Sequence, residues 1–474
     1  MKLKFRTKLA YGIGNLGYGT IAQMVSNFIM FFGTSILGLP GTLVGIAIAL
    51  SVFWDGISDP IIGYFSDLHN SKIFGKRLGF MLIGTLGVAI FNLLLWVIPM
   101  EMSVGLKFCW LLVSLLAIET FNTLFATPYV ALGIDIAPDY SEQSSVQGFK
   151  TTFFILGMVM PSVLMFLFMP GGEGAQGQFN QSAYINIAYF TSALCLIAGT
   201  ICILGTLKKV QSIYKEEKEK KREKNFFFKI FYLFFTSLKK KNYGSLIIGY
   251  SVALISAAFL TSVGMHLFTY SYHFGSTQIS ILMSILFVSA ILSQPFWIYL
   301  SNRIDKKPAL NISLLIILIG IGLTALTFIF RGLMRQTLLF WLVAPCILFC
   351  GFGTGALYSL PISMYADVIT MDRLETGENN TAIYSGFMTL AYNIANCLAL
   401  LVIGVLLDII KFDPKQPVQA LSVQNWLGVI VFLGCAISIS LAMLIFSKYK
   451  LKRADVLKAK MKEEKRANSL QEKK

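Results

Sequence analysis

Long apolar segments constrain the fold of this chain more than any other feature. Twelve mostly apolar stretches recur along the 474-residue sequence, and each has at least roughly the 20 residues that a helix needs to cross a bilayer. Hydrophobic residues make up 55% of the chain and the mean hydropathy is +0.69, values that exclude an ordinary soluble domain. We predict an all-α integral membrane protein with twelve transmembrane helices, at residues 9–37, 42–65, 79–99, 106–134, 146–169, 183–206, 244–271, 278–300, 309–330, 336–368, 381–409 and 424–447.

Basic residues are spread unevenly between the two sides of these segments. The chain holds 40 Lys and Arg against 24 Asp and Glu, for a net charge of +16. Only five of the 40 lie in loops that follow odd-numbered spans, namely Lys107, Arg331, Arg335, Lys411 and Lys415. The positive-inside rule therefore predicts that both termini are cytoplasmic, in a multi-pass protein of a bacterial cytoplasmic membrane. No aromatic-basic recognition motif accompanies the charge, so we expect no nucleic-acid partner.

The spans divide into two halves of six. We predict an N-terminal bundle at 1–207, a basic cytoplasmic linker at 208–243, a C-terminal bundle at 244–447 and a basic cytoplasmic tail at 448–474. Within the linker, aromatic residues at 226–235 lie between lysines, a pattern typical of a helix in the membrane interface. The alternative is a solvated linker whose end begins the next span. The tail carries charges at helical spacing, which predicts a loose cytoplasmic helix.

Two aspartates, Asp55 and Asp59, lie inside the second apolar segment. A charged carboxylate at the middle of a spanning helix costs ~2.5–3.5 kcal/mol on insertion scales. Positions i and i+4 share one helix face, and Ser58 lies close to both. Since hard cations prefer oxygen ligands, the pattern favours a cation site. The alternative is a structural ion pair with a neighbouring helix, for which Lys150 is the one membrane-depth cation that we find.

Two loops at matching positions of the halves repeat one pattern. The loop after the second span holds Asp67 followed by Lys76 and Arg77, and the loop after the eighth span holds Asp305 followed by two lysines. An acidic residue beside a basic loop is typical of a latch that breaks when two halves rock. Positive-inside topology with tight turns is the alternative for both loops.

Four stretches carry a family pattern: Lys8–Gly14; Trp54–Pro60; Pro128–Leu132 with Asp135, Asp139 and Glu142; and Ala366–Ile369 with Thr376–Glu378. They resemble the glycoside–pentoside–hexuronide:cation symporters of the major facilitator superfamily, which include the melibiose permeases. The resemblance implies two six-helix bundles that move a solute together with Na⁺, Li⁺ or H⁺ by alternating access. It implies that Asp55, Asp59, Ser58 and Thr123 bind the cation. It also implies that Asp67, Lys76, Arg77, Asp139, Glu142, Asp305 and Asp367 act in gating.

The solute-facing positions depart from the melibiose permeases. No acidic residue lies near Tyr18, an apolar Ala126 replaces the acidic residue of the fourth span, and Asn393 replaces a lysine. Lys150 replaces an arginine and loses the bidentate fork. The polar residues that remain inside the spans are our candidates for solute binding: Asn15, Gln23, Asn27, Glu119, Asn122, Lys150, Tyr358, Tyr392 and Asn393.

Two of these candidates have alternatives. Glu119 senses protons or binds the solute, or else pairs with a neighbour near the outer leaflet. Lys150 meets an anionic group of the solute, neutralises an aspartate, or reaches the cytoplasmic surface. His266 is expected to be a hydrogen-bonded packing residue.

We predict a secondary active transporter, a Na⁺- or H⁺-coupled symporter of a sugar, glycoside or related small solute. The alternatives are a carrier of an amphiphilic or lipid-like solute and, from another class, a non-transporting receptor or scaffold. No serine, cysteine or metal constellation indicates an enzyme or a cofactor, and no metal is expected beyond a possible Na⁺ at Asp55 and Asp59. The G-x-G-x-x-G match at Gly12–Gly17 lies inside an apolar span with no strand before it, so it predicts close helix packing. The expected partners are the solute, the coupling cation and the bilayer, and the protein is predicted to act as a monomer.

Overall fold

The computed structural model describes residues 3–69, 71, 73–137, 140–169, 177–214, 240–376, 381–413, 416, 418–459 and 461. In these ranges the chain forms long helices and no named strand, apart from one isolated bridge between Ser71 and Gly75. The predicted all-α membrane fold is thereby confirmed. The predicted interfacial helix at 226–235 and the residue Asp139 lie outside the described residues.

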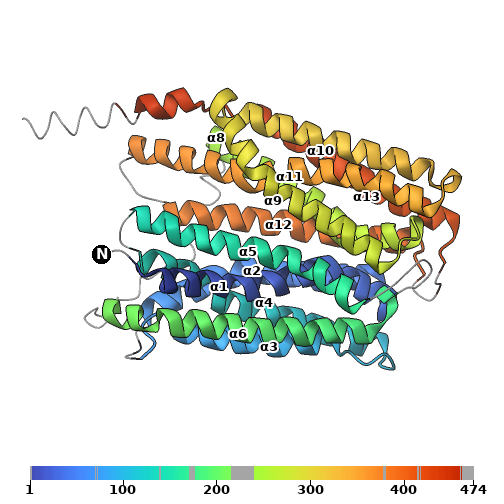
Figure 1. Ribbon diagram of the computed structural model, residues 1–474, viewed down its shortest axis with the longest axis horizontal. Coiled ribbons are helices and arrows are strands. Elements are labelled where there is room, and N and C mark those ends of the chain that lie inside the picture. Colours follow the sequence, from blue (N-terminus) through green and yellow to red (C-terminus); the bar gives the residue numbers. More distant parts are fainter. Residues whose placement is uncertain are drawn as a thin grey trace, which may run out of the picture. The chain divides into compact units, whose positions relative to one another are not determined.

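Twelve long helices make up the described chain (Figure 1). They are α1 (Phe5–Phe31), α2 (Gly41–Leu68), α3 (Leu78–Trp96), α4 (Val104–Asp135), α5 (Tyr140–Phe168), α6 (Gln181–Tyr214), α8 (Lys241–His266), α9 (Ser276–Ile304), α10 (Lys306–Ile329), α11 (Gln336–Thr376), α12 (Thr381–Ile409) and α13 (Leu421–Ser447). Short π-helical segments extend α1 (η1, Phe32–Ile36) and α8 (η3, Leu267–Ser271), and 3-10 turns lie at Gly177–Phe179 (η2) and Arg331–Leu333 (η4). Several helices run past their predicted ends, and α11 continues from the predicted limit at 368 to Thr376.

Eleven of these helices are long and apolar enough to cross a membrane, and α1 is not among them. The expected first span therefore differs from the others in composition. At 27 residues α1 is long enough, but it carries polar residues such as Asn15 and Asn27 on buried positions. A helix enclosed by other helices needs less apolar surface than one that faces lipid, so its lower hydropathy is consistent with an interior position.

Packing divides the chain into two compact units. The first contains 1–223, 259–284 and 397–431, and the second contains 224–258, 285–396 and 432–474. The first unit thus gathers the end of α8, the start of α9, and the segment from the middle of α12 to the first part of α13. The six-helix halves at 1–207 and 244–447 stay a prediction at the level of the sequence.

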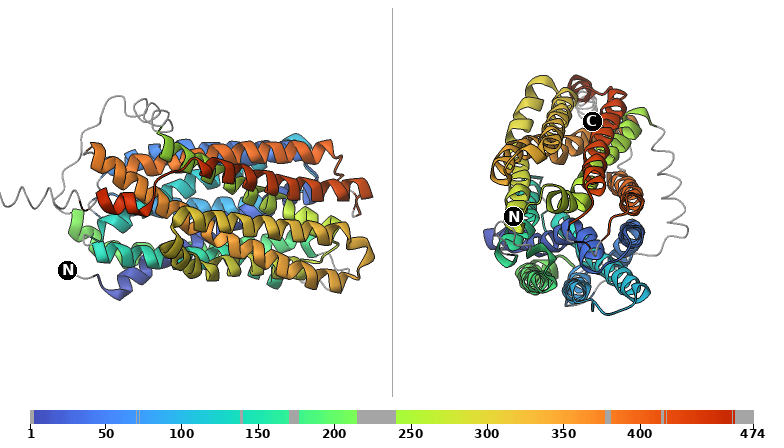
Figure 2. Two further views of the ribbon diagram at one scale, coloured as in Figure 1. Left: turned by 90° about the horizontal axis from the view of Figure 1, so that it is seen from above. Right: turned by 90° about the vertical axis from the view of Figure 1, so that its right-hand side faces the viewer.

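In the first unit the helices pack in an order that joins distant segments. Helix α1 packs against α5 and α6, α6 against α3, α3 against α4, and α4 against α2. Figure 2 shows several of these helices nearly end-on in its right-hand view. Glycines permit the close approaches: a Cβ on Gly17 would lie 2.6 Å from the Cα of Cys195, and one on Gly14 would lie 2.8 Å from the Cys202 sulfur. The glycine pattern at 12–17 is therefore a helix-packing feature, as predicted.

In the second unit α10 and α11 form the most extensive helix pair. Its core includes the fully buried Trp297 and Met364, together with Tyr449 at the end of α13. The tail is helical over 453–459, and its first residue is fixed: the Arg453 amide donates to Asp305 (3.2 Å) and its guanidinium to the Asn302 carbonyl (3.0 Å). These two bonds join the start of the tail helix to the turn between α9 and α10, and the loose cytoplasmic helix stays a prediction.

Candidate cation and solute site

Helices α2 and α4 place acidic and hydroxyl side chains opposite one another. The Thr123 hydroxyl donates to Asp55 (3.1 Å) and lies 3.0 Å from the Ser58 hydroxyl. Ser58 and Thr123 are buried, whereas both aspartates are partly exposed. The four residues predicted to form a cation site are therefore in one cluster, except that Asp59 joins it through a different hydroxyl.

Thr127 is that hydroxyl, and the sequence analysis missed it. Its Oγ1 donates to Asp59 (3.0 Å), one turn along α4 from Thr123. The aspartates are spaced i and i+4 on α2, and the threonines are spaced i and i+4 on α4, so the pairs repeat with the helical period. This matched spacing was the signal available in the sequence.

A fourth hydrogen bond helps to set the register of α2 against α4. The Trp54 indole nitrogen donates to the Thr120 hydroxyl (2.8 Å), next to the acidic pair. Further along the same two helices, a Cβ on Gly63 would lie 3.3 Å from the Thr127 methyl group, so α2 and α4 are also close at that point. Pro60 has no N–H, so the helical bond to the Gly56 carbonyl is not made and that oxygen is freed between the two aspartates.

Glu119 lies one turn before Thr123 on α4. Its carboxyl group lies near Asn122 and within electrostatic range of Asp55. Asn122 is 4% exposed, and its Oδ1 has no hydrogen-bond partner in the described part of the chain. Among the described residues no three His, Cys, Asp or Glu side chains gather as a metal site, so an ion at this place needs hydroxyl or carbonyl ligands as well.

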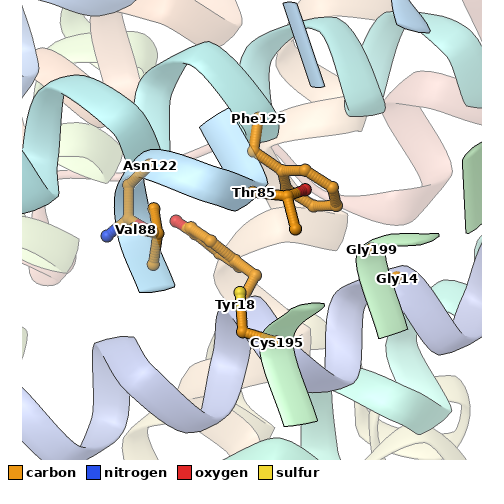
Figure 3. A pocket seen from close by; sticks show the side chains of 8 residues that line it. All are labelled: Gly14, Tyr18, Thr85, Val88, Asn122, Phe125, Cys195 and Gly199. Carbon is orange, nitrogen blue, oxygen red and sulfur yellow. The ribbon is translucent and has the colours of Figure 1, made fainter. Parts of the chain in front are cut away.

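A small pocket adjoins Asn122 inside the first unit (Figure 3). The phenol of Tyr18 extends toward Asn122, and Thr85 and Phe125 close the opposite side. The pocket has room for about one water molecule, which needs polar partners such as the free Asn122 oxygen. It is too small for an organic solute.

The candidates on α1 and α5 contact groups of the protein itself, and their part in solute binding stays a prediction. Asn15 donates to the Lys150 backbone carbonyl (3.1 Å), and Gln23 donates to Asn27 (2.8 Å) along the same helix. The Lys150 ammonium lies 5.9 Å from the centre of the Tyr129 ring, a cation–π distance. His266 is buried and hydrogen-bonded to Thr34, as expected for a packing residue.

The remaining solute candidates lie in the second unit. Tyr358 on α11 and Tyr392 on α12 are within electrostatic range of each other and of Tyr250 on α8, which the sequence analysis did not select. Asn393 follows Tyr392 directly in the sequence, and its side chain is buried, with the residue 5% exposed. These three tyrosines, which come from three helices, are here called the tyrosine group.

The predicted gating residues of the first half form two ion-pair groups. Arg77 binds Asp67 (2.5 Å), Asp135 (3.3 Å) and the Ser66 hydroxyl (2.7 Å). Lys76 beside it is buried.

The second group joins the start of α1 to the start of α5. Glu142 binds the Lys8 ammonium (2.8 Å) and accepts a bond from the Leu3 amide (3.2 Å).

The second loop is built differently. Asp305 caps α10 by accepting a bond from the Lys306 amide (2.7 Å), with a positive φ of 79°. The basic partner of Asp367 is Lys306 (2.5 Å). Lys307 instead donates to two carbonyls near the tail, those of Ser447 (2.8 Å) and Tyr449 (2.7 Å).

Comparison with known proteins identifies the family. The family model described as MFS/sugar transport protein matches residues 10–453. The chain belongs to this family. It is therefore a membrane transporter of the major facilitator type and not an enzyme, which confirms the resemblance and the fold expected from the sequence.

Similar proteins include symporters over nearly the whole length. An uncharacterized symporter of Synechocystis is 25% identical and the match covers 89% of both chains. The sodium-dependent lysophosphatidylcholine symporter 1 of Xenopus tropicalis is 24% identical over 95% of this chain and 88% of its own. Among solved structures, the D-xylose–proton symporter has a TM-score of 0.63 at 12% identity, covering 94% of this chain and 99% of that one. This last likeness concerns the fold alone.

Proposed function

We propose that this protein is a Na⁺-coupled symporter whose cation is held by Asp55 and Asp59. The observation that carries the proposal is the pairing of each carboxylate with a threonine hydroxyl of α4. Carboxylate and hydroxyl oxygens suit a small hard cation. Two relatives described as sodium-dependent lysophosphatidylcholine symporters support Na⁺ as the coupling ion.

The physical role of the ion follows from the position of the acids. Both aspartates lie within an apolar helix, where their charge is costly. A bound cation neutralises that charge and joins α2 to α4 through shared oxygens. Transport is coupled if the empty and fully loaded carriers reorient while the half-loaded carrier does not, which requires a coupling free energy of typically ~1–3 kcal/mol.

The solute that we propose is a sugar, a glycoside or a related small organic molecule. The description of the family model supports this class. The tyrosine group supplies hydroxyl donors and ring faces of the kind that bind such molecules.

An amphiphilic solute is the second candidate, and a specific observation favours it. Relatives named as lysophosphatidylcholine symporters match this chain over 94–95% of its length in five cases. The acidic residues that hold sugars in melibiose permeases are also absent near Tyr18 and at Ala126. A lipid needs an apolar slot and fewer polar partners.

Solute-dependent ²²Na⁺ uptake into proteoliposomes tests the proposal. Sugars, glycosides and lysophospholipids are supplied separately, with Na⁺, Li⁺ or K⁺ outside. We expect one of these solute classes to stimulate Na⁺ entry, and we expect solute uptake not to be driven when K⁺ replaces Na⁺. Equal solute flux with and without a Na⁺ or H⁺ gradient would refute symport, and no flux for any solute would support a receptor or scaffold. We further propose a bacterial cytoplasmic membrane location with both termini inside, and a monomeric carrier.

A further inference from the structure

We propose that Asp408 is a positioning residue of the transport cycle: it latches the start of α2 to α12 in the state seen here and releases it when that end opens. Both carboxylate oxygens are engaged. Oδ1 accepts a bond from the Gly41 amide (2.7 Å) and Oδ2 accepts one from the Thr42 amide (2.8 Å). These contacts lie within the first compact unit.

Helix α2 has no cap of its own. Pro40 precedes it without a side-chain cap, and its first turn contains no acidic residue. The first amides of a helix lack intrahelical partners, and the N-terminal end attracts negative charge. Asp408, 366 positions away in sequence, supplies both the acceptors and the charge.

The position of Asp408 on its own helix points the same way. It lies in the last turn of α12, where a negative charge opposes the helix dipole. An acidic residue there is unfavourable unless a partner compensates, and the start of α2 is that partner. When the contact breaks, the first amides of α2 lose their acceptors and Asp408 loses its favourable partner. We therefore expect the contact to be either fully formed or fully broken.

Glycines bring the two helices close enough for this bond. A Cβ on Gly404 would lie 2.4 Å from the Gly41 carbonyl oxygen, and one on Gly45 would lie 2.8 Å from the Leu400 carbonyl oxygen. Glycines spaced four residues apart are typical of close helix contacts in membranes. A side chain at Gly404 therefore separates α2 from α12 at the latch.

A second polar contact closes the same end of the first unit. The Thr34 hydroxyl in η1 lies 2.7 Å from Nε2 of His266, and both residues are buried. Rings pack around the imidazole, with Phe31 at 5.0 Å and Phe412 at 5.2 Å between centroids. Thr34, Phe31, His266, Phe412 and the turn η3 are here called the sealed region, which adjoins the latch in the chain because Thr34 precedes Gly41 and Phe412 follows Asp408.

The functional consequence rests on the proposed symport. Helix α2 runs without a break from the latch at Gly41 to Asp55 and Asp59. Alternating access requires a state in which this end is open, and Asp408 then leaves the amides of α2. The latch therefore sets how often that state is visited, and the same helix carries the change to the proposed cation site.

Cysteine labelling of the purified full-length protein tests the latch without solute or Na⁺. The reporter is Ser271→Cys, a near-isosteric change at a position that is 1% exposed in the sealed region. It is made in a Cys109→Ser background, because Cys109 is exposed. Asp408→Asn removes the charge and one of the two acceptor oxygens, and we expect a maleimide to label the reporter roughly 3- to 30-fold faster, with full loss of a helix cap as the upper limit.

Two controls make the result decisive. Asp413→Asn removes a nearby acid that does not cap α2 and should leave the rate unchanged. Ile62→Cys, 8% exposed toward the other end of α2, should stay protected in Asp408→Asn. If Asp408→Asn does not fold, Gly404→Val replaces it and should accelerate labelling in the same direction.

An unchanged rate in the folded variants, or faster labelling at both Ser271→Cys and Ile62→Cys, would overturn the latch. Neither outcome affects the Na⁺ flux test of the proposed symport, so the two failures are distinguishable.

Discussion

Two pairs of acidic residues in the described part of the chain have different kinds of partner. Asp55 and Asp59 inside α2 hydrogen-bond to threonine hydroxyls. Asp67 and Asp367, near helix ends, each bind a basic side chain. Fixed counter-charges hold loops in place, whereas a hydroxyl can donate to a carboxylate and still offer its oxygen to an ion. The contrast separates a proposed binding site from a structural network made of the same residue type.

The largest effect is expected when the charge of Asp55 or Asp59, the two acids bound to hydroxyls, is removed. Asp59→Asn or Asp55→Asn should reduce Na⁺-driven accumulation by about 100-fold or more, because the ion loses a charged ligand in an apolar setting. The measurement is solute uptake in proteoliposomes under a Na⁺ gradient. Glu101→Gln, which removes an exposed loop carboxylate, is the control and should transport normally. Full accumulation by both aspartate variants would contradict the proposed site.

Removing the counter-charge of the other group should affect stability first. Arg77→Gln leaves Asp67 and Asp135 without their shared partner, and we expect a loss of about 2–3 kcal/mol in the free energy of unfolding. Arg77 is nearly buried, but Asp67 is 57% exposed at its side chain, which keeps the loss below that of a fully buried pair. A denaturant titration in detergent measures it. A midpoint equal to that of the wild type would show that the pair is not structural.

The threonines allow a finer test of the first group. Thr127→Val keeps the shape of the side chain and removes the hydroxyl that binds Asp59, so Na⁺ affinity should fall about tenfold. The fluorescence of Trp54, whose indole bonds to α4 beside Asp55, should report Na⁺ binding without solute. Thr152→Val on the exposed face of α5 is the matched control. An unaltered Na⁺ titration in Thr127→Val would exclude this hydroxyl as a ligand.

The smallest effect is expected at the second loop. Lys306→Gln removes the partner of Asp367, but both side chains are 22% exposed, so the loss of stability should be about 1 kcal/mol or less. Its effect should shrink further in 0.5 M salt, because solvent-exposed charges are screened. A loss as large as that of Arg77→Gln would show that the two loops are equivalent after all.

The sequence predicted the membrane fold and the core of the cation cluster for clear physical reasons. Length and hydropathy specify spanning helices, and the i, i+4 spacing specifies that Asp55 and Asp59 share a face. Spacing within α2 says nothing of which α4 hydroxyl meets each acid, so Thr127 was missed.

Contacts between a side chain and a backbone group could not be predicted, because the backbone partner leaves no pattern in the sequence. Asp408 binds two amides, and any residues at 41 and 42 other than proline carry such amides. Asn15 is similar, because its partner is the Lys150 carbonyl and not a side chain. A polar residue inside a membrane helix indicates that a polar partner is needed, but the sequence does not specify whether that partner is a solute or another part of the protein.

The π-helical turns η1 and η3 change what the loss of one residue does to the chain. η1 follows α1, η3 follows α8, and each holds about one residue more per turn than an α-helix. Deleting a single residue from η1 would convert it to an α-helical turn and leave the flanking helix facing nearly the same way. The same deletion in the regular part of α1 would turn the two parts of that helix by about 100° relative to each other. These two turns are therefore where we expect the helices on either side to tolerate a one-residue deletion best.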